Sequence, residues 1–80
     1  MRKIRITSNM TYVGEVIASV DETVKDILEQ NGVAVTGQLM INRNFATPGA
    51  ANMTLRELGF DDGSDEVITI QSVVKADNAR

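Results

Sequence analysis

The densest group of potential metal-ligating side chains is the acidic stretch "DDGSDE" at residues 61–66. Carboxylate oxygens are the ligands that hard cations such as Ca²⁺ prefer. A calcium loop of the common type needs the spacing D-x-[DN]-x-[DN]-G followed by a distant Glu, and this stretch has neither. We therefore interpret it as a turn with solvated acids, in which Gly63 is free to take a positive φ angle. No metal ion and no other cofactor is expected.

Residue types that support catalysis are also scarce. The chain contains no His and no Cys, which removes the usual general base and the commonest metal ligand, and also any disulfide or zinc–thiolate site. The serines have no His to activate them, so a hydrolase triad is excluded. The carboxylates of Asp21 and Glu22 stand where a helix is expected to begin, and acids there favour the helix dipole. The sequence predicts a protein that is not an enzyme.

Two groups of side chains could instead contact a partner. Arg2, Lys3 and Arg5 form a cationic cluster that either binds an acidic or phosphate-bearing surface or simply protects a strand with solvated charges, and the second interpretation is favoured. Met40 is either an adaptable contact residue or a side chain half-buried under the loop that follows. Arg43 lies close to Met40 in the sequence and makes a partner site there more plausible.

Length and charge limit the protein class. Eighty residues make one domain, and the net charge of -3 with a pI of about 4.7 argues against a nucleic-acid partner. No apolar run approaches the roughly 20 residues that span a bilayer, and after "MRKIR" the chain becomes polar, unlike a signal peptide. The absence of Cys fits a reducing compartment. We expect a cytoplasmic domain with no membrane association.

The N-terminal third predicts a β-hairpin. Residues 2–7, "RKIRIT", alternate apolar and polar side chains with the period of a half-buried strand. The turn formers in "SNM" come next, and "TYVGEVIAS" at residues 11–19 is rich in β-branched and aromatic residues. Tyr12 and Val16 share one parity and Ile17 has the other, so the facing of this strand is open. Gly14 could mark a bulge that switches the register.

A single short helix is expected after the hairpin. Thr23 and Asp26 match the capping pattern [ST]-x-x-[DE], with Asp21 as a rival N-cap, and Asn31-Gly32 supplies a C-terminal stop. A helix of about nine residues is too short to be stable alone in water, so a sheet must support it. Its apolar stripe at spacing i, i+3, i+4 consists of Val24, Ile27 and Leu28.

The C-terminal half predicts further strands around an irregular loop. "QLMIN" at residues 38–42 is a strand, and residues 43–53 form a loop with Phe45 as its anchor and a short edge strand at 44–46. Thr54 with Glu57 would complete a second capping box, and "EVITIQSVV" is the last strand. The plug that closes the core between them consists of Leu55, Leu58 and Phe60. This order predicts an α+β fold, a mixed sheet of four to five strands packed on one helix, with the first and last strands parallel at its centre.

The segment "TLRELGFDDGSDEVITI" resembles the ubiquitin-like β-grasp family. "DETVKDILEQNGV" resembles the family helix, and "QLMINRN" resembles its third strand and the following turn. The resemblance implies one ubiquitin-like β-grasp domain over residues 1–74 and a flexible C-terminal tail over residues 75–80. It also implies that Met40 holds the central apolar position of the sheet face that ubiquitin uses for binding, with Thr69 and Gln71 beside it.

The printed sequence departs from the conjugating members of that family, which end in Gly-Gly, because no Gly follows Gly63. We expect a non-enzymatic protein–protein interaction module of unidentified partner and oligomeric state, and an accessory subunit of a larger bacterial assembly fits, since some secretion systems contain such β-grasp proteins. The expected contact residues are Met40, Arg43, Arg5 and Thr69. The alternatives are a covalent modifier or sulfur carrier, and a nucleic-acid-binding β-grasp domain.

Overall fold

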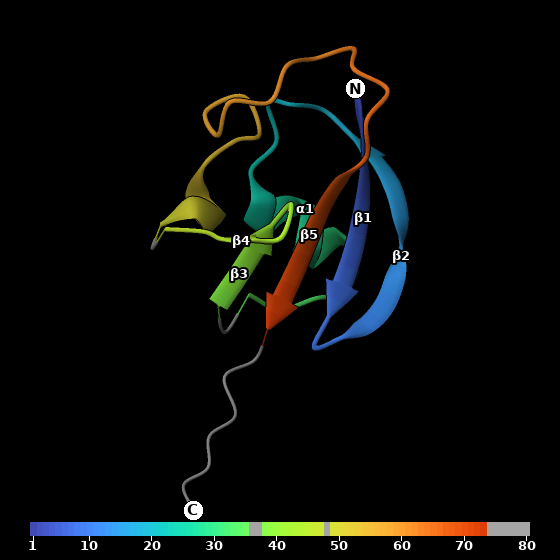
Figure 1. Cartoon of the computed structure of the whole chain (residues 1–80), viewed down its shortest axis with the longest axis vertical. Helices are drawn as coiled ribbons and strands as arrows, with labels where there is room; N and C mark the ends of the chain where they lie inside the picture. Colours follow the sequence, from blue (N-terminus) through green and yellow to red (C-terminus); the bar gives the residue numbers. More distant parts are fainter. Residues whose placement is uncertain (36–37, 48, 74–80) are drawn as a thin grey trace, which may run out of the picture.

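In the computed structural model, which describes residues 1–35, 38–47 and 49–73, five strands form one mixed sheet with the order β2-β1-β5-β3-β4 (Figure 1). The expected α+β architecture, a sheet of four to five strands packed on one helix, is confirmed. The predicted tail over residues 75–80 lies outside the described residues. The elements are β1 (Arg2–Ser8), β2 (Thr11–Ala18), α1 (Val24–Gln30), β3 (Gln38–Ile41), β4 (Asn44–Phe45), the 3₁₀ turn η1 (Ala50–Asn52) and β5 (Ile68–Val73).

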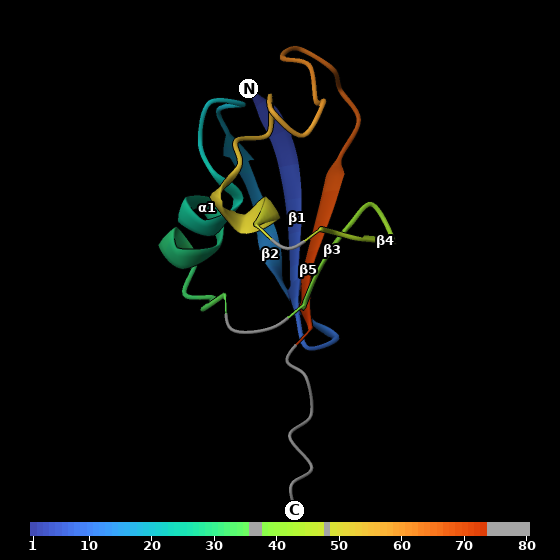
Figure 2. The same ribbon diagram turned by 90° about the vertical axis from the view of Figure 1, so that its left-hand side faces the viewer.

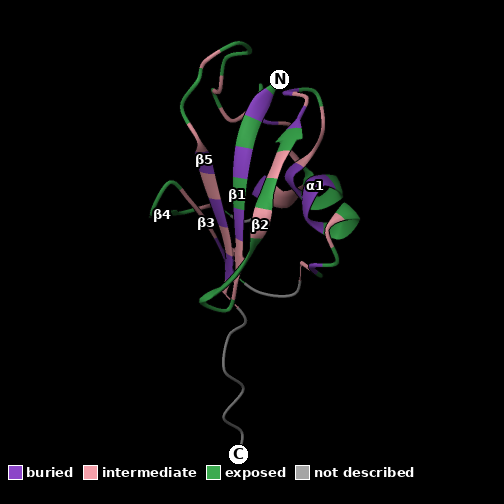
Figure 3. Cartoon of the chain, turned by 90° about the vertical axis from the view of Figure 1, so that its right-hand side faces the viewer, coloured by how far each residue is buried: buried purple, intermediate pink, exposed green. Residues whose placement is uncertain are grey.

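The centre of the sheet is the parallel pair of β1 and β5, as the sequence predicts. Ile4 lies opposite Ile68 and Ile6 lies opposite Ile70, and all four side chains are fully buried. The residues that alternate with them face away from the core, so β1 shows buried and exposed bands in turn (Figure 3). The outer strands β2 and β3 flank this pair in antiparallel orientation. Alternating apolar residues thus place the core on one face of the sheet.

Helix α1 covers that face of the sheet, and η1 lies on the same side (Figure 2). The hydroxyl of Thr23 accepts a hydrogen bond from the amide of Asp26 at 3.1 Å, so Thr23 is the N-cap. At the C-terminal end, the amide of Gly32 donates to the carbonyl of Glu29, and the amide of Val33 donates to the carbonyl of Leu28. These two hydrogen bonds form a Schellman motif, which ends the helix. The helix has seven residues, Val24–Gln30, and the predicted length of about nine is reached only when the N-cap Thr23 and the C-cap Asn31 are counted.

A β-bulge sets which side chains of β2 face the core. Ile6 pairs with Gly14 but the next residue, Thr7, pairs with Tyr12, which leaves Val13 as an extra residue. The prediction of a register switch near Gly14 is confirmed. Because of the switch, Tyr12 lies on the face of the sheet away from α1, although it shares its parity with core-facing residues farther along the strand.

Both hairpins of the sheet close with two-residue turns in which both central residues have positive φ angles. These are Asn9 and Met10 between β1 and β2, with φ of 51° and 68°, and Asn42 and Arg43 between β3 and β4, with φ of 51° and 71°. Such angles are those of a type I′ turn, whose twist matches the twist of paired strands. Each turn begins with Asn, which tolerates the left-handed region better than most residues.

The segment before β5 closes the open end of the core. The hydroxyl of Thr54 accepts from the amide of Glu57 at 3.1 Å, while a Glu57 carboxylate oxygen accepts from the amide of Thr54 at 2.9 Å. This is the predicted capping box, and it leads into a series of turns over residues 55–59 in place of a regular helix. Leu55 is fully buried. The other two predicted plug residues, Leu58 and Phe60, pack partly buried against the core.

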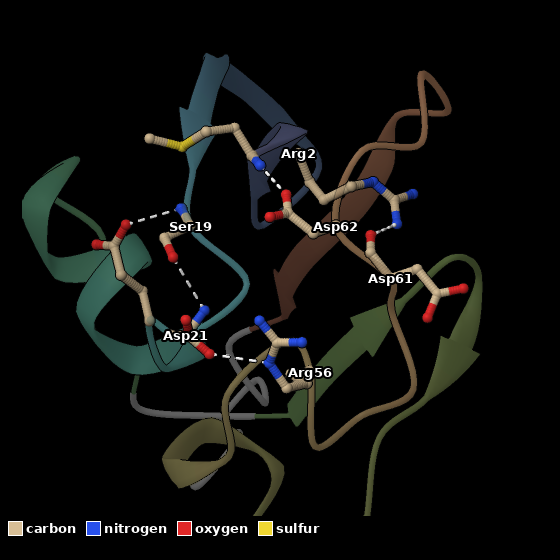
Figure 4. A network of polar contacts seen from close by, with 8 residues as sticks. Arg2, Ser19, Asp21, Arg56, Asp61 and Asp62 are labelled. Atoms are coloured by element: carbon tan, nitrogen blue, oxygen red, sulfur yellow. Dashed lines mark hydrogen bonds and ion pairs between the residues drawn. The ribbon is translucent and has the colours of Figure 1, made fainter.

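Arg2 does not belong to an exposed cationic cluster, so that part of the sequence interpretation is wrong. Its side chain is buried at 5% exposure, 5.7 Å from the ring centroid of Phe60. The guanidinium donates to the main-chain carbonyl of Asp61 at 2.8 Å (Figure 4) and to that of Glu66 at 3.1 Å. Arg2 points inward because the even-numbered side chains of β1 face the core. Its two hydrogen bonds hold the acidic turn over the end of the core.

Candidate functional site

The strand register aligns five side chains in one line across the whole sheet, on the face away from α1. Tyr12 lies opposite Thr7, Thr7 lies opposite Gln71, Gln71 lies opposite Met40, and Met40 lies opposite Phe45. Residues that lie opposite each other in paired strands project from the same face. We name this line the outer row, and it includes one residue from each of the five strands.

The two ends of the outer row are exposed aromatic residues. Tyr12 is 61% exposed and Phe45 is 70% exposed, whereas Thr7, Gln71 and Met40 between them are partly buried. Met40 thus has one apolar neighbour in the row, Phe45, and one polar neighbour, Gln71. An exposed apolar surface of this kind, interspersed with hydrogen-bonding groups, is typical of a contact face for another macromolecule.

The prediction that Phe45 anchors the loop after β3 is wrong. Phe45 belongs to the two-residue edge strand β4, which confirms the predicted short strand, and its side chain is largely solvent-exposed. The buried anchor of this part of the chain is Ala50, which is 1% exposed. Ala50 belongs to η1, which packs against α1.

Arg5 and Thr69, two of the predicted contact residues, are neighbours on the outer face. They lie opposite each other on β1 and β5, and Glu15 of β2 lies opposite Arg5 on its other side. The guanidinium of Arg5 donates to Glu15 Oε2 at 2.8 and 3.1 Å, and this hydrogen bond together with the negative charge raises the pKa of Arg5. The charge of Arg5 is therefore already compensated, so it is less available to an external carboxylate.

The turn that carries Arg43 is tied to Thr69. The amide of Asn42 donates to the carbonyl of Thr69 at 2.8 Å, and the side-chain oxygen of Asn42 accepts from the amide of Thr69 at 2.9 Å. The turn thus continues the pairing of β3 with β5 beyond Ile41. Arg43 is exposed at its tip and makes no ion pair within the described part of the chain.

The four predicted contact residues therefore occupy one region: Met40, Thr69 and Arg5 on the outer face and Arg43 at its border. Their role in binding stays a prediction. Sequence reasoning did not select the exposed residues Tyr12, Ile17 and Phe45. The Ser-Asn-Met-Thr turn and Gly14 indicated a hairpin with a bulge near Tyr12. The face on which Tyr12 lies, however, depends on the exact position of the bulge, which the sequence does not give.

Charge is distributed unevenly between the two sides of the sheet. Lys3, Arg5 and Arg43 are exposed on or beside the outer face, where Glu15 is the acidic residue. By contrast, residues 19–31 and 54–66, around α1 and the core end, contain nine acidic and two basic residues. One of the two, Arg56, donates to Asp21 at 3.0 Å (Figure 4), and this hydrogen bond raises its pKa. The outer face is thus the less acidic side of an acidic molecule.

A hollow of about 240 Å³ lies between the β3–β4 hairpin and the segment before β5. We name it the hairpin hollow. Two of its lining residues are asparagines, which we call its rim, and the others are apolar and form what we call its wall. The residues that line it are Ile41, Asn42, Asn44, Phe45, Ala46, Leu58 and Phe60.

The comparisons with known proteins add no relative. No protein-family model, curated protein or solved structure matched the chain. Among the described residues, no group of three or more acidic side chains is arranged to hold a metal ion. In the same residues, no helix is both long and apolar enough to cross a membrane.

Proposed function

We propose that this chain is a non-enzymatic protein-interaction module with a ubiquitin-like β-grasp fold, and that it binds its partner through the outer face of the sheet. The fold assignment is supported by the strand order β2-β1-β5-β3-β4, by the parallel central pair and by one helix crossing one face. This is the arrangement that the sequence resemblance implies. A role as an accessory subunit of a larger bacterial assembly in the cytoplasm belongs to the same proposal.

The observation that carries the proposal is the outer row. Two aromatic side chains are more than half exposed at its ends, and the side chains between them offer a thioether, an amide and a hydroxyl. Aromatic residues and Met are enriched at protein interfaces, and the burial of apolar area yields about 25 cal/mol per Å². A sheet face that carries a Met and, at the two ends of the row, exposed aromatic rings can therefore bind a partner without reorganising its backbone.

A charge placed at Met40, inside the outer row between Gln71 and Phe45, should strongly weaken partner binding. Met40→Glu would bury a carboxylate against the partner, and we expect recovery of specific partners in affinity capture from the native cell to fall by about tenfold or more. Ala34→Glu is the matched control, since Ala34 is exposed after α1 and receives the same charge. Equal recovery of the same proteins by the wild type and both variants, quantified by mass spectrometry, would contradict the outer face as the contact surface.

One observation favours a second candidate, a single-stranded nucleic acid. Exposed aromatic rings on a sheet face that also carries Lys3, with Arg43 at its border, could stack with bases while the two cations contact phosphates. The net charge of -3 and the pairing of Arg5 with Glu15 oppose this candidate. Elution from heparin at low salt is the expected result. Retention at moderate salt that Arg43→Gln reduces would instead favour the nucleic-acid function.

A further inference from the structure

We infer that the hairpin hollow is a second docking site, distinct from the outer row, for an extended peptide segment that presents an apolar side chain next to a carboxylate. The site goes beyond the proposed function, which uses the outer face of the sheet, because the hollow lies between the β3–β4 hairpin and the segment before β5. Phe45, the last residue of the outer row, also borders the hollow. A partner on the outer face could thus continue into it.

The wall of the hollow fits one apolar group. Ile41, Ala46, Leu58 and Phe60 are all only partly buried, so apolar surface of each remains open to the hollow. Its volume of about 240 Å³ exceeds the roughly 150 Å³ in which an engineered apolar cavity holds benzene. An aromatic ring or a branched aliphatic side chain can therefore enter without displacing the wall.

The rim offers hydrogen bonds to a main chain. The side-chain amide of Asn44 donates only a long hydrogen bond of 3.4 Å to the carbonyl of Asn42, and an Asn amide has two donors. Asn44 lies on β4, which is at the edge of the described sheet and pairs on one side only, with β3. The free edge of this two-residue strand leaves a short row of main-chain groups to which an extended peptide can add. The segment would run along β4 with its side chain in the hollow.

Charge decides the orientation and the chemistry of the segment. Arg43, at the hairpin tip between the two rim asparagines, is exposed and unpaired within the described residues. On the opposite wall, acidic residues are the sequence neighbours of the lining residues, with Glu57 directly before Leu58 and Asp61 directly after Phe60. A carboxylate would be repelled there and attracted at Arg43. The segment should therefore place its apolar side chain toward Leu58 and its carboxylate toward the hairpin tip.

The test uses 3-phenylpropionate, which joins an aromatic ring to a carboxylate, as a probe in ¹⁵N-edited NMR titrations of the full chain. We expect shifts that concentrate on the amides of Ile41, Ala46 and Leu58, with a Kd in the millimolar range of about 1–10 mM, given the size of the probe. 3-Phenylpropanol, which lacks the carboxylate, should bind about two- to fivefold more weakly.

Two variants separate the contributions of charge and shape. Arg43→Gln should remove the preference for the carboxylate, so that both compounds bind equally, while Lys25→Gln on α1 removes an equal charge elsewhere and should leave the preference intact. Ala46→Leu should fill the hollow and abolish the shifts from both compounds. If that variant does not fold, the Arg43→Gln comparison alone decides.

Two results would overturn the inference. One is the absence of shifts at the hollow up to tens of millimolar probe. The other is a set of shifts that gathers on Tyr12 and Ile17 in place of the hollow. A carboxylate preference that survives Arg43→Gln would equally reject the assigned chemistry.

Discussion

At the scale of single residues, the two hairpin turns contain backbone strain, because non-glycine residues adopt positive φ angles there. The stability of the rest of the fold compensates for this cost. Met10 has a φ of 68° and Arg43 a φ of 71°, in a region that side chains with a Cβ atom enter at a cost of roughly 1–2 kcal/mol. Met10 is also 85% exposed, so its side chain gains little from packing. The strained turn at Arg43 places this cation between Asn42 and Asn44, which line the hairpin hollow.

Met10→Gly should stabilise the protein. Glycine enters the left-handed region without steric cost, and Asn-Gly is the preferred pair for a type I′ hairpin, so the free energy of unfolding should rise by about 0.5–1 kcal/mol. Urea unfolding monitored by circular dichroism would measure the gain at an unchanged m value. Met10→Ala is the control and should bring no such gain, since Ala keeps the Cβ atom. Equal effects of Gly and Ala would refute the strain at this turn.

At the scale of elements, α1 is stable because of its ends and its support. A seven-residue helix gains too little from its own hydrogen bonds to persist in water. Its N-cap residue, Thr23, also forms a β-bridge with Thr54, the first residue of the second capping box, and the amide of Val24 donates to the carbonyl of Met53. The two capped segments thus hold each other in place, and both pack on the sheet.

Thr23→Ala should destabilise the protein by about 1 kcal/mol, because the amide of Asp26 loses the hydroxyl that accepts its hydrogen bond. Thr23→Ser retains an acceptor at the same position and should lose only a few tenths of a kcal/mol. Hydrogen exchange of the first-turn amides of α1 would show the loss locally, and chemical unfolding would show it globally. Faster exchange in both variants to the same extent would mean that the hydroxyl is not the cap.

At the scale of the whole molecule, stability depends on a small core. A chain of 80 residues has a total stability of about 4–12 kcal/mol at the usual 0.05–0.15 kcal/mol per residue. The parallel pair of β1 and β5 contributes four fully buried Ile side chains to a core that also includes α1. Each of these side chains joins sequence segments more than 60 residues apart, so the loss of one weakens the whole sheet.

Ile70→Ala should therefore lower the free energy of unfolding by about 2–5 kcal/mol, through lost apolar burial and the cavity that remains. Gln71→Ala, the next residue and a member of the outer row, should change it by about 0.5 kcal/mol or less, because its side chain faces away from the core. Thermal unfolding of the two variants side by side tests which face of β5 is the core. Similar losses in both would contradict the facing of this strand.

The sequence alone determined the elements and their order, because local periodicity and capping chemistry operate within a few residues. The alternation of Ile68 and Ile70, the caps at Thr23 and Thr54 and the stop at Gly32 each predict a structure that is observed. The parallel central pair also followed, since a two-layer fold of this order leaves few alternatives.

Only the tertiary structure decided which side chains form the surface. The bulge at Val13 reverses the facing of Tyr12, and the inward start of β1 buries Arg2. Phe45 on the edge strand β4 is exposed, whereas Ala50 in η1 is buried. Each outcome depends on contacts between distant segments and on the volume left to fill, which a local pattern of apolar and polar residues does not encode. The outer row exists for the same reason, because its five members are neighbours in register and far apart in sequence.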